Sequence, residues 1–148
     1  MKRLIAKQKA PIFSNSIEHL HNKTKYWISE IEFIKIEQDF LKELLGEHVM
    51  GLCTSNNFKN AKLFLKVIYH EKILGEKLTK SIKEHQINLA LLIENIYLKK
   101  EDSFRKDHEH LKIELINYID NFKYIKEQVF ELILHIMKKE KQQKLLAK

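Results

Sequence analysis

Residues 58–98 read FKNAKLFLKVIYHEKILGEKLTKSIKEHQINLALLIENIYL, and this stretch decides the fold. Starting at Phe64 and moving along the chain alternately by four and by three residues selects Phe64, Ile68, Glu71, Gly75, Leu78, Ile82, His85, Leu89, Leu92 and Ile96. Apolar residues that recur every 3.5 positions are typical of a long helix that packs along one seam against other helices. The stretch is therefore predicted to be the middle of three helices and to contact both of the others.

The same rhythm runs through the segments on either side. Before the middle helix it selects Phe13, Ile17, Leu20, Thr24, Trp27, Ile31, Ile34, Gln38, Leu41 and Leu45. After it the stripe is Phe104, His108, Leu111, Leu115, Tyr118, Phe122, Ile125, Val129, Leu132 and Ile136. Glycine and proline, which interrupt helices, occur only three times and once. We expect helices at about 15–50, 57–98 and 103–140, joined by loops at 51–57 and 99–103.

Short loops force consecutive helices to run antiparallel. The fold class is therefore expected to be all-α, an elongated antiparallel up-down-up three-helix bundle with coiled-coil-like packing over residues 13–137. A basic lead-in at 1–12 precedes it, and a basic tail at 138–148 follows it. No apolar run approaches the roughly 20 residues that a membrane-spanning helix needs, so no transmembrane segment is expected.

The net charge of +7 raises the question of nucleic-acid binding. Residues 1–12 carry four basic and no acidic side chains, and residues 138–148 carry five basic and one acidic. These two ends account for +8, which leaves −1 for residues 13–137. Weak electrostatic binding of nucleic acid through the tails is thus one alternative function, without a recognition-helix pattern to support it.

Polar residues interrupt the apolar stripes and are the first candidates for chemistry. Folding the helices at the expected loops places His85 level with Thr24 and Tyr118, and Glu71 level with Gln38. One interpretation is that these buried polar layers fix the register of the bundle at some cost in stability. The other is a small internal pocket in which desolvation raises the pKa of Glu71.

A second polar cluster is expected at one end of the bundle. Glu18 and His21 share a helix face at i, i+3 spacing, and Asp107 and His108 begin the third helix. Carboxylate and imidazole groups from facing helices can bind zinc or iron, so a metal site at Glu18, His21, Asp107 and His108 is an alternative function. The competing interpretation is a solvated surface in which acids simply favour helix starts. No other cofactor is expected.

Cys53 is the only cysteine, so the chain has no internal disulfide. This usage agrees with a reducing, cytoplasmic compartment. His48 is the nearest histidine along the chain, but closeness in sequence alone does not define a nucleophile and its base. We predict no catalytic residues and do not expect an enzyme.

Further apolar residues lie away from the core stripes. The first helix carries Phe33, Ile36, Phe40 and Leu44, and the middle helix carries Tyr69, Ile73, Ile87, Leu91 and Leu98. Aligned apolar side chains outside a core indicate a partner surface, although they can also widen the core itself. The expected partner is a second copy, which gives a dimeric homo-oligomer, or another helical protein.

The stretch SIEHLHNKTKYWISEIEFIKIE at 16–37 resembles the opening of small uncharacterised bacterial helical-bundle proteins. The resemblance rests on EHLH followed by a tryptophan and an acidic helix. It implies a helical fold and no particular activity. The sequence as a whole predicts a non-enzymatic structural or protein-protein interaction module that associates with itself.

Overall fold

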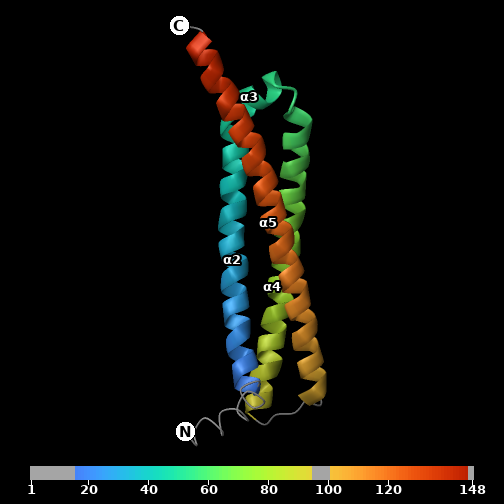
Figure 1. Ribbon diagram of the computed structural model, residues 1–148. Coiled ribbons are helices and arrows are strands. Elements are labelled where there is room, and N and C mark those ends of the chain that lie inside the picture. Colours follow the sequence, from blue (N-terminus) through green and yellow to red (C-terminus); the bar gives the residue numbers. More distant parts are fainter. Residues whose placement is uncertain (1–15, 95–100, 147–148) are drawn as a thin grey trace, which may run out of the picture. The chain divides into compact units, whose positions relative to one another are not determined.

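The computed structural model describes residues 16–94 and 101–146, with the side chains of 101 and 102 left out. Four helices lie in these ranges (Figure 1): α2 at Ile17–Glu47, α3 at Val49–Thr54, α4 at Phe58–Ile93 and α5 at Glu101–Leu146. None of the described residues forms a strand, so the all-α prediction is confirmed. None of these helices combines the length and the apolar character that crossing a membrane requires.

The segment after the first long helix was predicted to be a loop at 51–57; this was wrong for 51–54 and is confirmed for 55–57, which lie outside any helix. The structure places the short helix α3 there, after a break at His48. Leu52 is buried to 1% exposure, which explains why the segment folds back instead of remaining open. The first long helix accordingly ends at Glu47, before the predicted boundary at 50.

The end of α3 is a turn that asparagine makes possible. Asn56 adopts a left-handed backbone with φ 61°. Its N–H donates to the carbonyl of Cys53, and the N–H of Asn57 donates to the carbonyl of Leu52. This pair of bonds is the Schellman motif, in which glycine or asparagine takes the left-handed position. The turn leads directly into α4.

Other boundaries also differ from those expected. Helix α4 ends at Ile93, not near 98, and α5 begins at Glu101. Helix α5 continues to Leu146, so most of the predicted tail at 138–148 is helical. The predicted lead-in at 1–12 and the stripe residues Phe13 and Ile96 lie outside the described residues, as do residues 99 and 100 of the predicted connection at 99–103. The rest of that connection was predicted wrongly, because 101–103 belong to α5.

The predicted stripes form the buried side of the three long helices. Almost every described stripe residue is buried, including the polar ones. Ile17 and Phe64 are half-buried. In α5 the stripe shifts near its end, where Ile133 is buried and Leu132 is half-buried. This shift follows from the helix itself, because an α-helix turns once per 3.6 residues and drifts against a strict 3.5 repeat.

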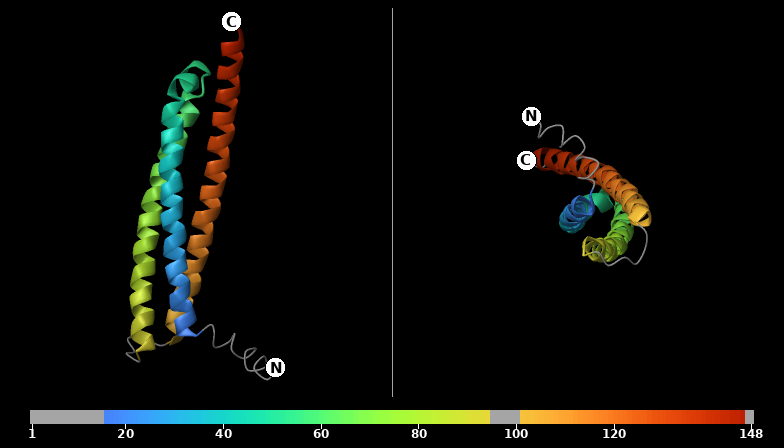
Figure 2. Two further views of the ribbon diagram at one scale, coloured as in Figure 1. Left: turned by 90° about the vertical axis from the view of Figure 1, so that its left-hand side faces the viewer. Right: turned by 90° about the horizontal axis from the view of Figure 1, so that it is seen from below.

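The contacts divide the chain into two compact units, and each contains a segment of every long helix. Of the described residues, unit 1 contains 16–32, 76–94 and 101–116, and unit 2 contains 33–75 and 117–146. Within each unit the segments of α2, α4 and α5 lie side by side, as the views in Figures 1 and 2 show.

In unit 1 the contacts give the order in which the helices meet. Leu20 of α2, Leu89 and Leu92 of α4, and Phe104 of α5 form one buried cluster, with Ile17 packed against it. Further along α2 and α5, the ring of Trp27 stacks on His108. Residue numbers therefore rise together along α2 and α5 in this unit.

In unit 2 polar contacts give the same order for α2 and α5. Gln38 bonds to Tyr118, and His48 bonds to Glu140. Lys126 of α5 also reaches α2, because its Nζ lies 2.9 Å from Glu37 Oε2. Helix α4 of this unit contributes Lys72, whose ammonium lies 3.3 Å from Asp39 Oδ1 of α2.

Candidate functional site

An apolar ribbon lies exposed on α2 in unit 2. We define the α2 ribbon as Phe33, Ile36 and Phe40, which are 59%, 66% and 54% exposed. Residues at i, i+3 and i+7 share one face of a helix, so the three side chains form one continuous surface. Leu44, predicted to continue this stripe, is half-buried. The ribbon is the clearest candidate for a partner surface.

A second apolar surface lies on α4 of the same unit. Tyr69, one of the apolar residues predicted to lie away from the core stripe of this helix, is 63% exposed, whereas Ile73, another of them, is half-buried. Leu63 and Leu65 were not predicted to belong to a partner surface, but both are exposed and lie among three lysines. Together they line a surface hollow of about 490 Å³, formed by Lys59, Lys62, Leu63, Leu65 and Lys66. The signal was present in the sequence as lysines spaced three and four residues apart around leucines.

The remaining predicted stripe residues of α4 divide in the same way. Ile87 in unit 1 is 61% exposed, and Leu91 is half-buried. Leu98 lies outside the described residues.

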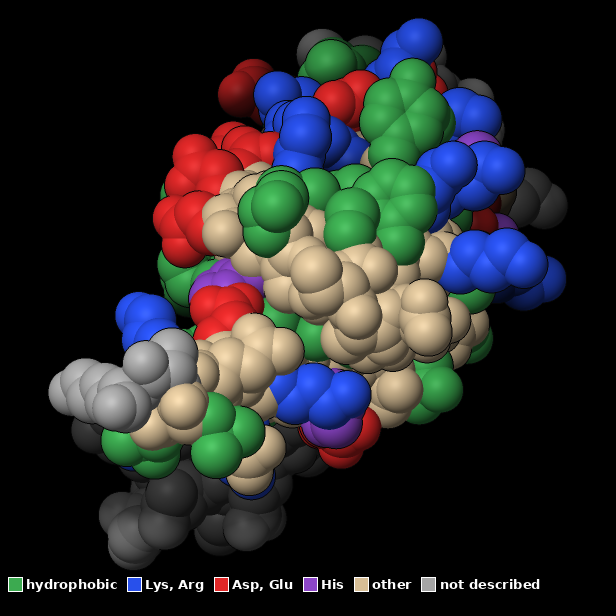
Figure 3. All heavy atoms as spheres, turned by 90° about the horizontal axis from the view of Figure 1, so that it is seen from above, with side chains coloured by type: hydrophobic (Ala, Val, Ile, Leu, Met, Phe, Trp, Pro, Cys, Tyr) green, Lys and Arg blue, Asp and Glu red, His purple; other side chains and the backbone are tan. Residues whose placement is uncertain are grey.

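From the side on which α3 lies, hydrophobic side chains reach the surface between groups of basic and of acidic side chains (Figure 3). Apolar side chains in a charged surround are typical of interaction surfaces.

The most enclosed polar group of unit 1 is a pair of histidines. His85 Nε2 and His108 Nδ1 are 3.0 Å apart, and both side chains are buried. A hydrogen bond at this distance needs a proton on one of the two facing nitrogens and a lone pair on the other. His85 was predicted to lie in a polar layer, but its contact with His108 was not predicted. The alignment at the loops had placed Tyr118 at its level.

The electrostatics around His108 favour its neutral imidazole. Burial, together with the smaller effects of the charges on His85, Lys112, His19 and Arg105, lowers the pKa of His108 to about 4. A protonated ring would be desolvated among groups of the same sign, which disfavours the charged form. His108 is therefore neutral near pH 7, and its role in the pair is that of a hydrogen-bonding group.

A basic cleft opens next to His108. It encloses about 330 Å³ and lies between the first turns of α2 and of α5. Its lining comprises His19, Leu20, Lys23, Trp27, Arg105, His108, Glu109 and Lys112. This cleft was not predicted from the sequence. The signal was present in the basic residues of each helix, which recur one or two turns apart at 19 and 23 and at 105 and 112.

The structure does not bring the four predicted metal ligands together. Glu18 is exposed, His21 and Asp107 are half-buried, and His108 is buried against Trp27 and His85. Within residues 16–94 and 101–146, no three His, Cys, Asp or Glu side chains are placed to share a metal ion. The zinc or iron alternative remains a prediction from spacing alone.

The polar layer of unit 2 combines Gln38, Glu71 and Tyr118, all of which are buried. Gln38 Nε2 donates to the Tyr118 hydroxyl oxygen at 3.4 Å. Burial and, to a lesser extent, the charge of Glu71 raise the pKa of Tyr118 to about 12, against an opposing effect of the hydrogen bond with Gln38. Burial also raises the pKa of Glu71. Gln38 Oε1 and Glu71 Oε2 find no hydrogen-bond partner among the described residues.

Thr24, the fifth predicted layer residue, has a local role in unit 1. Its side chain is fully buried, and its hydroxyl donates to the carbonyl of His21 at 2.5 Å. A threonine that bonds to its own helix satisfies its polar group without any partner from another helix. Thr24 therefore needs no functional explanation.

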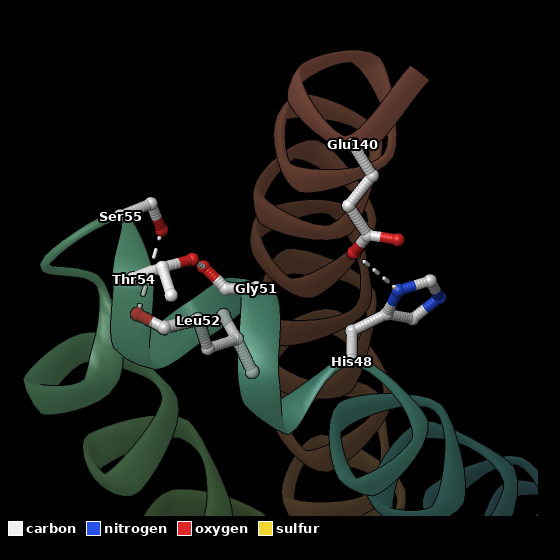
Figure 4. A network of polar contacts seen from close by, with 6 residues as sticks. All are labelled: His48, Gly51, Leu52, Thr54, Ser55 and Glu140. Atoms are coloured by element: carbon white, nitrogen blue, oxygen red, sulfur yellow. Dashed lines mark hydrogen bonds and ion pairs between the residues drawn. The ribbon is translucent and has the colours of Figure 1, made fainter. Parts of the chain in front are cut away.

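The α3 region contains a polar network of its own (Figure 4). His48 Nδ1 lies 3.2 Å from Glu140 Oε1 of α5, and the hydroxyl of Thr54 donates to the Gly51 carbonyl. A Cβ added at Gly51 would overlap Ile136 and Glu140, so α3 approaches α5 closely at this glycine. Cys53 is exposed, and His48 is engaged with Glu140. This arrangement does not pair a nucleophile with its base.

Comparison with models of protein families, with curated proteins and with solved structures gives no match. The function is therefore inferred from the α2 ribbon, the α4 surface and the polar groups described above.

Proposed function

We propose that this chain is a non-enzymatic interaction module, an up-down-up three-helix bundle with coiled-coil-like packing that associates with itself as a homodimer. The bundle is supported by the order of contacts, since residue numbers rise together along α2 and α5 in each unit. In unit 1 the α4 cluster residues Leu89 and Leu92 meet the first turns of both neighbours, while His85 meets α5 further along. The buried stripes, which follow a 3.5-residue rhythm, support the packing mode.

The α2 ribbon is the observation that carries the proposal. Three large apolar side chains, each more than half exposed, occupy one face of a helix. Burying such a side chain completely is worth about 1.5–3 kcal/mol. A contiguous face of this kind is more informative than scattered exposed leucines, because only an aligned face can be covered by one partner.

Charge complementarity supports a second copy as the partner. The α2 segment from 33 to 47 carries four acidic side chains and two lysines. The α4 segment from 58 to 75 carries four lysines and one glutamate, Glu71, which is buried. By side-chain count, the α2 segment that bears the ribbon has a net charge of −2, and the α4 segment that bears Leu63 and Leu65 has a net charge of +3. Two of the acids, Glu37 and Asp39, already pair with Lys126 and Lys72 within the same copy. In a twofold dimer, the ribbon of each copy packs on the α4 surface of the other, so that both charge patterns are matched.

The setting proposed for the module is the cytoplasm. Cys53 is exposed on the surface, and a single accessible thiol remains reduced in that compartment.

Sedimentation velocity over a wide range of concentrations tests the dimer. The wild-type chain is expected to show the mass of two copies and to dissociate on dilution. Ile36→Glu places a further carboxylate on the acidic α2 segment and should weaken dimerisation at least tenfold. Ile113→Glu is the matched control, because Ile113 is a comparably exposed isoleucine of α5 in unit 1. A wild-type mass of one copy at every concentration, or equal effects of the two variants, would overturn the proposal.

A further inference from the structure

The last turns of α5 in unit 2 form a basic segment. Residues 132–146 contain one acidic residue, Glu140, and four lysines: Lys138, Lys139, Lys141 and Lys144. Glu140 already pairs with His48, at 3.2 Å. None of the four lysines pairs with a carboxylate among the side chains of 16–94 and 103–146. The positive charge of this segment is therefore not offset within the described part of the chain.

The residues outside that part do not offset the charge either. The stretches 1–15, 95–100 and 147–148 contain no aspartate and no glutamate, so their side chains add positive charge only. Glu101 and Asp102, whose side chains are left out, begin α5 in unit 1, at the opposite end of the helix from the lysines. The basic character of the α5 end thus follows from the sequence itself.

Apolar side chains share one face of the helix with these lysines. We define the α5 tip as Leu134, Met137, Lys138, Lys141, Lys144 and Leu145. Leu134 and Met137 lie on one line of the helix at i, i+3 spacing. Lys141 and Leu145 continue that line at i+7 and i+11, and the other two lysines lie beside it. The three apolar side chains are 55%, 47% and 63% exposed, in chain order.

The end of α5 extends beyond its contacts with α3. Ile136 and Glu140 lie against Gly51 of α3. Every residue from 141 to 146 is exposed, and the helix continues past α3 (Figure 1). Three exposed turns with apolar and basic side chains on one face can lie along a flat surface, which a core helix cannot do.

We propose that the α5 tip binds the surface of an anionic membrane, with the helix lying in the plane of the lipid headgroups. The leucine and methionine side chains enter the boundary between headgroups and acyl chains. The lysine stems lie along the same boundary and keep their ammonium groups among the lipid phosphates. Binding of this kind combines the burial of apolar area with attraction to anionic lipids, and the α5 tip supplies both.

The apolar side chains favour a membrane over nucleic acid, the other large anionic partner. A phosphate backbone would attract the lysines but would leave Leu134, Met137 and Leu145 in water. A second copy of the α5 tip would bring like charges together. The inference does not depend on the proposed dimer, because the α5 tip shares no residue with the α2 ribbon or with the α4 surface.

Sedimentation with lipid vesicles tests the proposal on the full-length protein. One set of vesicles is phosphatidylcholine alone, and the other is phosphatidylcholine and phosphatidylserine in equal parts. We expect binding to the anionic vesicles to be about tenfold stronger or more, and to weaken as salt screens the surface charge. Double-stranded DNA, titrated at the same ionic strength, measures the competing nucleic-acid interaction.

Two triple variants locate the contact. The first replaces the lysines of the α5 tip: Lys138→Gln, Lys141→Gln and Lys144→Gln. Its matched control makes the same change of charge at three exposed lysines of α4 in unit 1: Lys77→Gln, Lys80→Gln and Lys83→Gln. Each lysine near an anionic surface contributes about fivefold in affinity, so the first variant should bind anionic vesicles on the order of a hundredfold more weakly. The control should lose much less.

A double variant, Met137→Gln with Leu145→Gln, removes apolar contacts without changing the charge. It should weaken binding to anionic vesicles by about tenfold and leave any binding to DNA unchanged. Circular dichroism checks that every variant remains helical. The proposal is overturned by equal binding to the two sets of vesicles, by equal losses in the two triple variants, or by a double variant that binds vesicles as wild type does. Tighter binding to DNA than to anionic vesicles would assign the α5 tip to nucleic acid instead.

Discussion

The indole of Trp27 stacks on the imidazole of His108, with ring centroids 4.4 Å apart and ring planes inclined by 29°. This contact joins α2 to α5 in unit 1 and covers one face of the histidine. A protonated imidazole can gain from an aromatic face, but burial and the cations nearby outweigh that gain and lower the pKa of His108 to about 4. The stack is therefore formed by a neutral ring, and its stability depends on pH.

We predict that the protein loses stability as the pH falls from 7.5 to 5. The unfolded chain protonates His108 near pH 6.5, whereas the folded chain does so only near pH 4. The unfolded state binds more protons in this window, so the contribution of His108 is present above pH 6.5 and is lost as the pH falls through its native pKa. The expected loss is on the order of 2 kcal/mol by pH 5, measured by urea unfolding.

Two substitutions isolate that contribution. His108→Gln removes the titrating group and should flatten the pH dependence of the free energy of unfolding, at some cost in stability at pH 7.5. His135→Gln removes an exposed histidine of the same helix and should leave the pH dependence unchanged. The groups that face His108 are His85, His19, Arg105 and Lys112, and they remain in both variants. An unaltered slope in His108→Gln would show that another group is responsible.

Gly75→Ala should destabilise unit 2 because its new methyl group would overlap the hydroxyl of Tyr118. Overpacking of this kind costs about 1–3 kcal/mol. Tyr118→Phe removes the hydroxyl and with it the bond from Gln38, so alone it should cost about 1 kcal/mol. In the double variant the overlap is relieved, and the loss should be smaller than the sum of the two single losses. Additive losses, measured by chemical denaturation, would exclude the overlap.

Glu71→Leu should stabilise the protein at pH 7 by about 1 kcal/mol, since it removes a buried carboxyl oxygen that has no partner among the described residues. Because burial raises the pKa of Glu71, its contribution is most favourable below about pH 4.5 and is lost as the pH rises through the raised pKa. The gain from Glu71→Leu should therefore shrink in acid. A gain that is the same at pH 4 and at pH 7 would contradict this cause.

Asn56 offers a test of the backbone at the end of α3. Its φ of 61° is strained for a residue with a branched or bulky side chain and costs a glycine nothing. Asn56→Ala should be about 1 kcal/mol less stable than Asn56→Gly, as measured by thermal unfolding. The side chain is exposed, so the two variants differ in little except this conformation.

The repeat of apolar residues was enough to predict the helices and their buried faces, because the side chain at each stripe position must leave water. It predicted burial even for Gln38, Glu71 and His85, since their neighbours in the stripe fix which way they point. The pairing of residues between helices could not be predicted as well. It depends on where each helix ends, and α4 ends at Ile93, earlier than expected, so His85 meets His108 in α5 and not the more distant Tyr118 position.

The basic cleft was missed for a different reason. Lys23, Arg105 and Lys112 look like ordinary solvated lysines and arginines in the sequence, and only the packing of α2 beside α5 in unit 1 gathers them around one hollow. The predicted metal ligands are the opposite case, a pattern in the sequence that the packing of the described helices does not bring together. Glu18 and His21 have a suggestive spacing, but spacing within one helix does not make the ligands of another helix converge on them.

The buried stripes also restrict how the length of this chain can change during evolution. A deletion or insertion of seven residues within α5 turns the following part of the helix by only about 20°, so the side chains beyond it keep their buried or exposed positions. A change of two residues turns it by about 200°, which would bring the buried Val129 to the surface and turn its exposed neighbours toward the core. Homologues of different length are therefore expected to differ by whole heptads within the long helices and by arbitrary numbers only at the turns.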